Sequence, residues 1–156
     1  MTLQLRAGLD ALLAGGVVAC PTEAVWGLSC DPDNPAAVER LLALKHRPVA
    51  KGLILVASDI TQVEGLLAGL SDGERARLAL SWPGPTTWLI PHHGRVPPWI
   101  CGSHESVAVR VTAHPGMAEL CSAWGGPLVS TSANPGGSQA PKQRFQVVRY
   151  FGDEID

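Results

Sequence analysis

Short apolar runs alternate along this chain with segments in which apolar residues recur at helical spacing. Residues 53–57 and 107–111 are rich in apolar and β-branched side chains, as expected of buried strands. Leu5, Leu9 and Leu12 lie at i, i+4 and i+7, the spacing of one helical face. This alternation predicts an α/β fold, a single-domain twisted mixed sheet that is covered by helices and at least partly parallel.

Capping signals mark the boundaries of two expected helices. Asn34 is a favourable N-cap, and Pro35 then occupies the first helical position. Pro48 is expected to end that helix at the residue before it. Ser71 and Glu74 have the spacing of a capping box, which predicts the start of another helix.

Two segments carry weaker signals. Residues 95–105 show no clear period and are expected to be irregular. A final helix is expected to dock on the core through an apolar stripe of Phe145, Val148 and Phe151. Beyond Gly152 the sequence is polar and acidic, and nothing in this segment is expected to pack.

Composition excludes several classes of protein. A chain of 156 residues with 46% hydrophobic residues can bury a core without disulfide or metal staples, so intrinsic disorder is excluded. The net charge of −2 argues against binding to nucleic acid through bulk charge. No run of about 18 apolar residues and no export signal is present, so a soluble, cytoplasmic protein is expected.

The cysteines and histidines show no metal-ligand spacing. No CxxC pair occurs, and the cysteines have mostly apolar neighbours, so they are expected to be reduced, buried thiols. The four cysteines are Cys20, Cys30, Cys101 and Cys121. No protein ligand set for a metal ion is therefore expected.

Polar segments adjoin three of the expected strands. Residues 21–23 follow one strand, Lys51 and Gly52 precede another, and residues 130–134 (Ser-Thr-Ser-Ala-Asn) follow a third. Because ligands collect where strands end in loops, residues 21–23 and 130–134 are candidate walls of a site. An ordinary polar turn explains residues 130–134 equally well.

Lys45 and Arg47 are further candidate residues, and their cluster is expected to join residues 130–134 in one active site. Cations are favoured in the last turn of a helix by its dipole, which is one interpretation of the pair. The other is a phosphate clamp, in which the arginine fork gives directional bonds and the lysine a point charge. The sequence contains no P-loop and no G-x-G-x-x-G, so a nucleotide would be held in another way.

Taken in order, these segments resemble the YrdC-type, or TsaC-like, threonylcarbamoyl-AMP synthase family over nearly the whole chain. The K-x-R and S-x-N signatures of that family fall at Lys45, Arg47, Ser132 and Asn134. The remaining matching segments are residues 15–19, 21–25, 27–28, 30–31, 51–54, 82–87, 107–111 and 114–115. The resemblance implies the YrdC-like fold over residues 1–156.

The resemblance also implies an activity. In this family L-threonine and bicarbonate give threonylcarbamate, which attacks the α-phosphate of ATP and releases pyrophosphate. Mg²⁺ is expected on the triphosphate, and a partner transferase complex passes the threonylcarbamoyl group to tRNA. The implied catalytic residues are Lys45, Arg47, Ser132 and Asn134; the ATP-binding residues are Arg47, Lys51, Thr87, Ser132 and Asn134; and the threonine-binding residues are Thr22 and Arg110.

This sequence departs from the family pattern at several points. Trp26 replaces the usual Tyr or Phe, and Ser29 replaces a common Gly. Family members continue past the position of Asp156 with a strand and a Pro-Ser segment that approaches the nucleotide. Without that segment, weak ATP binding is expected, whereas threonine binding through Thr22 and Arg110 should be better preserved.

A non-catalytic module that binds double-stranded RNA and acts in ribosome maturation is the alternative function. It would need its cations on one exposed face. The candidates for that face are Lys45, Arg47, Lys51, Arg110, Lys142, Arg144 and Arg149. The net negative charge and the lack of a paired aromatic RNA-recognition pattern count against this alternative.

Overall fold

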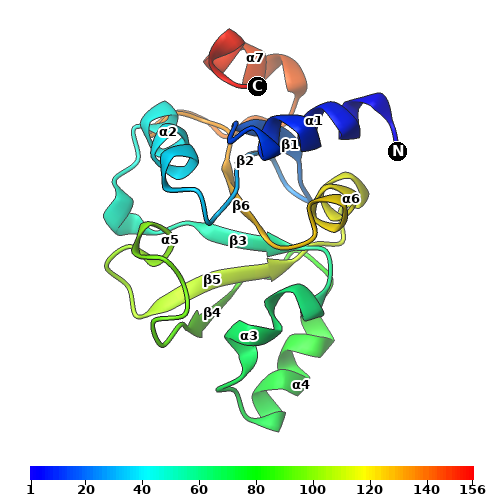
Figure 1. Ribbon diagram of the computed structural model, residues 1–156, viewed down its shortest axis with the longest axis vertical. Coiled ribbons are helices and arrows are strands. Elements are labelled where there is room, and N and C mark those ends of the chain that lie inside the picture. Colours follow the sequence, from blue (N-terminus) through cyan, green and yellow to red (C-terminus); the bar gives the residue numbers. More distant parts are fainter.

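A single six-stranded mixed sheet forms the centre of the computed structural model, which describes residues 1–156 (Figure 1). The strand order is β1-β2-β6-β3-β5-β4, and only β3 and β5 are parallel neighbours. The strands are β1 (Val18–Pro21), β2 (Trp26–Ser29), β3 (Ile54–Ala57), β4 (Trp88–Pro91), β5 (Ser106–Val111) and β6 (Leu128–Ser132). The expected mixed, partly parallel sheet is confirmed, although most of its strand pairs are antiparallel.

Side-chain alternation gives the sheet two different faces. The strand register aligns Leu55 with Val109 and Val129 on one face, which belongs to the larger hydrophobic cluster and is called the core face. It aligns Ile54 with Ala108 and Ser130 on the other, the open face. Because a strand has a period of two, the same register assigns further side chains to the open face. These are Val18, Gly27, Val56, Arg110, Leu128 and Ser132.

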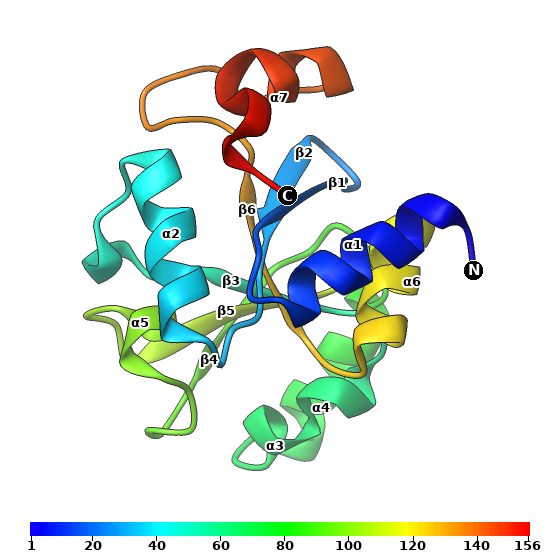
Figure 2. The same ribbon diagram turned by 45° about the horizontal axis from the view of Figure 1, so that its top comes forward.

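Helices cover the two faces unequally (Figures 1 and 2). Only α1 and α6 cover the open face, and they pack on one end of it, around Val18, Val56 and Leu128. The other helices contribute to the larger cluster on the core face. The helices are α1 (Leu3–Leu13), α2 (Pro35–Lys45), α3 (Glu64–Leu67), α4 (Asp72–Ser81), α5 (Pro98–Cys101), α6 (Pro115–Trp124), α7 (Arg144–Phe151) and the 3-10 turns η1 (Val49–Lys51), η2 (Ile60–Val63) and η3 (Gly152–Glu154).

The expected capping signals are confirmed. The side chain of Asn34 accepts from two backbone N–H groups at the start of α2, and Ser71 with Glu74 forms a reciprocal capping box on α4. Helix α2 ends at Lys45 because His46 adopts a left-handed conformation with φ of 51°. The helix therefore stops before Pro48 forces it to, and its last turn points toward the loop after β6.

Two sequence predictions about secondary structure are wrong in detail. Residues 95–105 contain the short helix α5, with Pro98 at its first turn. The core-facing residues of α7 are Val147 and Phe151, one turn apart, whereas Phe145 and Val148 are 65% and 56% exposed. The stripe was misassigned because residues 145, 148 and 151 and residues 147 and 151 both have helical spacing.

The last residues of the chain do pack, contrary to expectation. The backbone N–H of Asp156 donates to the carbonyl of Val17, and its carboxylate accepts from Val17 N at 3.0 Å and from Arg40. Ile155 packs against the larger hydrophobic cluster. This segment therefore lies beside the start of β1. No helix in the structure has the length and hydropathy needed to cross a bilayer.

Candidate active site

The end of α2 is bound to the turn that follows β6. Lys45 Nζ donates to the carbonyl oxygens of Ser132 and, at 2.9 Å, of Asn134, with Ser132 Oγ at 3.4 Å. In return the backbone N–H of Gly136 donates to the Lys45 carbonyl at 2.7 Å. The structure therefore brings together the K-x-R and S-x-N segments, which are about 87 residues apart in the sequence.

Lys45 is a buried lysine, not an exposed clamp. Only 4% of it is accessible, and its ammonium group, with three N–H bonds, faces three acceptors inside the chain. Burial and, secondly, the positive charge of Arg47 lower the pKa of Lys45 to about 8. Lys45 therefore holds the backbone of the turn and has no N–H left for a direct bond to phosphate.

Asn134, which the resemblance implies as an ATP-binding residue, has no N–H free for a phosphate oxygen. Its amide nitrogen already donates to the carbonyls of Pro135, at 3.1 Å, and Ser138, at 2.9 Å. Its Oδ1 is buried and has no partner. Since a phosphate oxygen needs a donor, Asn134 has no free group for a phosphate. Ser132 keeps its hydroxyl on the open face, beside Lys45.

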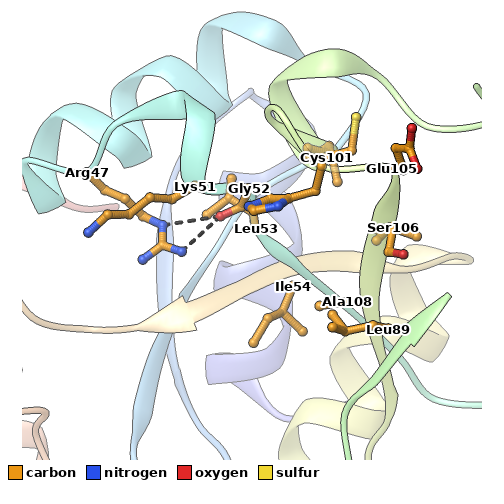
Figure 3. Close-up of a pocket in the computed structure, with 13 residues that line it drawn as sticks. Arg47, Lys51, Gly52, Leu53, Ile54, Leu89, Cys101, Glu105, Ser106 and Ala108 are labelled. Carbon is orange, nitrogen blue, oxygen red and sulfur yellow. Dashed lines mark hydrogen bonds between the residues drawn. The ribbon is translucent and has the colours of Figure 1, made fainter. Parts of the chain in front are cut away.

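Arg47 and Lys51 line a pocket of about 340 Å³ at the uncovered part of the open face (Figure 3). Arg47 Nε and Nη2 both donate to the carbonyl of Gly52, at 3.2 and 3.0 Å, which fixes the guanidinium and leaves Nη1 unpaired. Lys51 is exposed and makes no hydrogen bond through its ammonium group. The floor and far wall are formed by Leu53, Ile54, Leu89, Ile100, Cys101, His104, Glu105, Ser106, Val107 and Ala108.

Gly52 has to be a glycine for this pocket to form. Its φ is +72°, in the left-handed region that favours glycine, and an added Cβ would lie 3.1 Å from the carbonyls of Ile100 and Cys101. Its carbonyl is the acceptor that orients Arg47. The K-G dipeptide of the sequence therefore supplies an exposed cation and the anchor for a second one.

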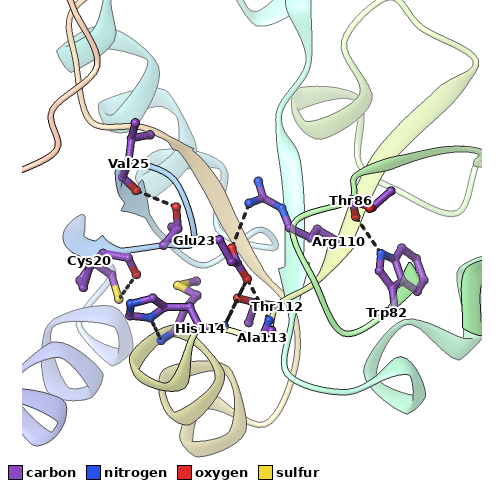
Figure 4. A network of polar contacts seen from close by, with 12 residues as sticks. Cys20, Glu23, Val25, Trp82, Thr86, Arg110, Thr112, Ala113 and His114 are labelled. Atoms are coloured by element: carbon purple, nitrogen blue, oxygen red, sulfur yellow. Dashed lines mark hydrogen bonds and ion pairs between the residues drawn. The ribbon is translucent and has the colours of Figure 1, made fainter. Parts of the chain in front are cut away.

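Arg110 lies further along the open face and is paired with Glu23 (Figure 4). Arg110 Nη1 donates to Glu23 Oε2 at 3.2 Å, and the two side chains are 15% and 14% exposed. Arg110 Nε is buried and has no partner. The other oxygen of Glu23 accepts from the hydroxyl of Thr112 and from the backbone N–H groups of Ala113, at 2.8 Å, and His114, at 3.2 Å.

Sequence reasoning gave Glu23 no role. Burial alone would raise the pKa of Glu23, but hydrogen bonds from Thr112 and from backbone N–H groups outweigh it and lower the pKa. Glu23 is therefore an ionised carboxylate at the site. The sequence feature that could have identified Glu23 as a site residue is its place in the polar segment 21–23, directly after a strand and next to Thr22.

Thr22 and Thr87 lie in different surroundings. Thr22 Oγ1 donates to the Val25 carbonyl at 2.6 Å, and its methyl group lies against Gly27 on the open face, near Ser130. Thr87 precedes edge strand β4, and continuing that register places it opposite Arg110. Three strand spacings, about 14 Å, separate β4 from β6, so Thr87 is not beside the 132–134 turn.

The cations do not form the single exposed face that an RNA-binding module would need. Lys45 is buried, and Arg110 is paired with Glu23. Arg47 and Lys51 line the pocket, whereas Arg144 belongs to α7 and lines a separate hollow between α1 and β1. The thiols are all free, with Cys20 half-buried and the other three buried, as expected.

Comparisons with known proteins show which proteins this chain is similar to. Residues 10–156 match the Sua5/YciO/YrdC family, which is described as "Telomere recombination". Threonylcarbamoyl-AMP synthases from Pseudomonas aeruginosa and Saccharophagus degradans are 61% and 59% identical to the chain. The alignments cover 91% and 92% of this chain and 76% and 75% of those proteins.

A solved structure shares the fold closely. The crystal structure of P. abyssi Sua5 complexed with L-threonine superposes with a TM-score of 0.91 at 31% identity. The match covers 98% of this chain and 45% of that one, so the chain spans about half the length of P. abyssi Sua5. On the family match and these relatives together, the chain belongs to the Sua5/YciO/YrdC family.

Proposed function

We propose that this chain is an L-threonylcarbamoyl-AMP synthase. L-Threonine and bicarbonate combine with loss of water to give threonylcarbamate. A carbamate oxygen then attacks the α-phosphate of ATP, which forms threonylcarbamoyl-AMP and displaces pyrophosphate. The observation that carries the proposal is the open face itself, where Arg47 and Lys51 line one end and Arg110 lies at the other. The relatives named threonylcarbamoyl-AMP synthase and the threonine-bound P. abyssi Sua5 support it.

The two ends of the open face suit two different anions. A triphosphate needs several positive charges, which Arg47 and Lys51 supply directly and Lys45 supplies at longer range. An amino-acid carboxylate needs one forked donor, which Arg110 provides beside Glu23, the residue that follows Thr22 in the sequence. The carboxylate of threonine and the triphosphate would then lie on one surface, with the reacting groups between them.

The residues act mainly by positioning and by charge. Threonylcarbamate is already an anion, so its attack on phosphorus needs no strong general base. The main barrier is repulsion between two anions, which fixed cations reduce because they need no reorganisation during the reaction. In this proposal Arg47 and Lys51 stabilise charge on the phosphates, Ser132 donates to a phosphate oxygen, and Asn134 holds the shape of the turn through its bonds to Pro135 and Ser138.

Mg²⁺ fits this scheme as part of the ATP substrate. The chain has no group of three His, Cys, Asp or Glu side chains that could hold a metal ion by themselves. We therefore propose that the ion arrives on the triphosphate, where it neutralises phosphate charge. The product would pass to a tRNA threonylcarbamoyl transferase complex in the cytoplasm, where ATP and tRNA are found.

Pyrophosphate release tests the proposal. Purified chain is mixed with Mg·ATP, L-threonine and bicarbonate, and each substrate is omitted in turn. We expect release only when all are present, and Arg47→Ala should lower the rate by at least about tenfold, the loss of one charged hydrogen bond or more. Equal release without threonine would refute the synthase. Tight binding of double-stranded RNA by such an inactive chain would favour the RNA-binding alternative.

A further inference from the structure

Glu23 connects two parts of the molecule that the sequence keeps far apart. It lies in the turn between β1 and β2, and its partners lie at the end of β5 and the start of α6, 87 to 91 residues later. Figure 4 shows its carboxylate directed between Arg110 and the turn at Thr112 and Ala113. A side chain that crosses between elements in this way restrains both of them.

The two carboxylate oxygens of Glu23 do different work. Oε1 receives the Thr112 hydroxyl and two backbone N–H groups, so it is anchored by three donors. Oε2 receives only Arg110 Nη1. Because the anchored oxygen cannot rotate away, the second oxygen has a fixed position, and the guanidinium bonded to it is held in one orientation.

This orientation leaves one terminal nitrogen of Arg110 unused. A guanidinium binds a carboxylate through hydrogen bonds from its nitrogens. Glu23 takes Nη1, Nη2 makes no hydrogen bond, and Nε is shielded from solvent, so a ligand oxygen cannot reach Nε. Nη2 is therefore the nitrogen that is available for a carboxylate.

We propose that Glu23 is a positioning residue that holds Arg110 with its Nη2 free for the carboxylate of the amino-acid substrate. This inference rests on the proposed function for the identity of that substrate. Glu23 itself does not touch the substrate. Its role requires the second oxygen to be an acceptor, because an amide nitrogen at that place would face the Arg110 donor and push the guanidinium out of position.

Glu23→Gln is the informative variant. Its amide oxygen can still accept from Ala113 and His114, so the β1–β2 turn stays anchored while the bond to Arg110 is lost. Calorimetric titration should show L-threonine binding weakened about tenfold, which corresponds to one well-oriented charged hydrogen bond. L-Threoninamide, which lacks the carboxylate, should bind both proteins equally. In turnover assays KM for threonine should rise by a similar factor with KM for ATP unchanged.

Two further proteins serve as controls. Glu119→Gln removes a carboxylate from an exposed position on α6 that has no ion-pair partner, and it should leave both titrations unchanged. Arg110→Ala should weaken threonine binding strongly, and adding Glu23→Gln to it should cause no further loss. Additive losses would show that Glu23 does not act through Arg110. Tighter threonine binding by Glu23→Gln would show that Glu23 competes with the substrate, and would overturn the proposal.

A ligand-free measurement separates this inference from the proposed function. In the NMR spectrum of the wild-type chain the Arg110 Nε–H, assigned by its loss in Arg110→Ala, should exchange slowly with water because it is buried and held. In Glu23→Gln its exchange should approach that of the exposed arginines. An unchanged signal would refute the positioning role. Failure of the wild-type chain to bind threonine would refute the proposed function and the substrate named here, whatever the NMR result.

Discussion

Replacing Lys45 with methionine should destabilise the fold as well as impair ATP use. From the sequence, a lysine in the last turn of a helix contributes only about 0.3–1 kcal/mol through the helix dipole. In the structure its ammonium group is buried and bonded to the carbonyls of Ser132 and Asn134. Methionine preserves much of the aliphatic stem, so the change isolates the loss of these bonds.

The size of the effect follows from the acceptors left behind. Each buried acceptor that loses its partner costs about 1–3 kcal/mol. Two carbonyls are affected, but residues 132 and 134 are half-buried, so water replaces part of the lost bonding. The variant also relieves the burial of a charge. We therefore expect a net loss of about 2–3 kcal/mol in the free energy of unfolding.

Urea denaturation at pH 7, followed by tryptophan fluorescence, measures this loss. Lys51→Met is the matched control, because Lys51 is exposed and makes no hydrogen bond, and it should change the free energy of unfolding by less than about 0.5 kcal/mol. If Lys45→Met were as stable as that control, the Lys45 contacts would contribute nothing to the turn. Lys45 would then be free to bind phosphate, as the sequence first indicated.

Three further predictions concern pH, the arginine clamp and substrate choice. The fold lowers the pKa of Lys45 from 10.5 to about 8, so between these pH values only the unfolded chain keeps the proton on this side chain. The free energy of unfolding of the wild type, relative to that of Lys45→Met in urea, should therefore rise with pH in this window. A difference that stays flat or falls would contradict the shift. In Arg47→Lys the lysine cannot form both bonds that Arg47 makes to the carbonyl of Gly52, so kcat/KM for ATP should fall roughly tenfold to a hundredfold in pyrophosphate-release assays. An unchanged kcat/KM would place the triphosphate elsewhere. L-Serine should replace L-threonine with kcat/KM lower by about tenfold to a hundredfold, since one methyl group is worth about 1–3 kcal/mol, and equal use of both would contradict a pocket for that methyl.

The sequence predicted the architecture well where local signals and periodicity agreed. Asn34 and Ser71 are caps because their side chains satisfy free N–H groups within the next three residues, an effect independent of the rest of the fold. The strands were found because β-branched apolar runs have few other stable uses. The stripe of α7 failed because Phe145 and Val147 are both apolar and only the docking of the helix decides between them.

The sequence predicted that the segments around residues 45 and 132 meet, but not how they are hydrogen-bonded. Family signatures pointed to Lys45 and Ser132, and the antiparallel pairing of β3 with β6 explains why their segments meet. That pairing places the carboxyl end of β6 beside the amino end of β3. Which N–H bonds of Lys45 remain free is a matter of tertiary distances, and no sequence pattern encodes it.

The contacts of Lys45 and Glu23 imply a division of labour within the site. Each is an ionisable side chain whose hydrogen bonds are made within the protein. Lys45 donates to the turn at 132–134, and Glu23 accepts from Arg110 and from the segment at the start of α6. Arg47 Nη1 and Arg110 Nη2 have no hydrogen-bond partner in the protein. Since a flexible cation loses conformational entropy when it binds an anion, holding the arginines in advance shifts that cost from binding to folding. Mutations at Lys45 should therefore lower both the stability of the fold and the affinity for ATP. Mutations at Lys51, which is exposed and unpaired, should lower only the affinity for ATP.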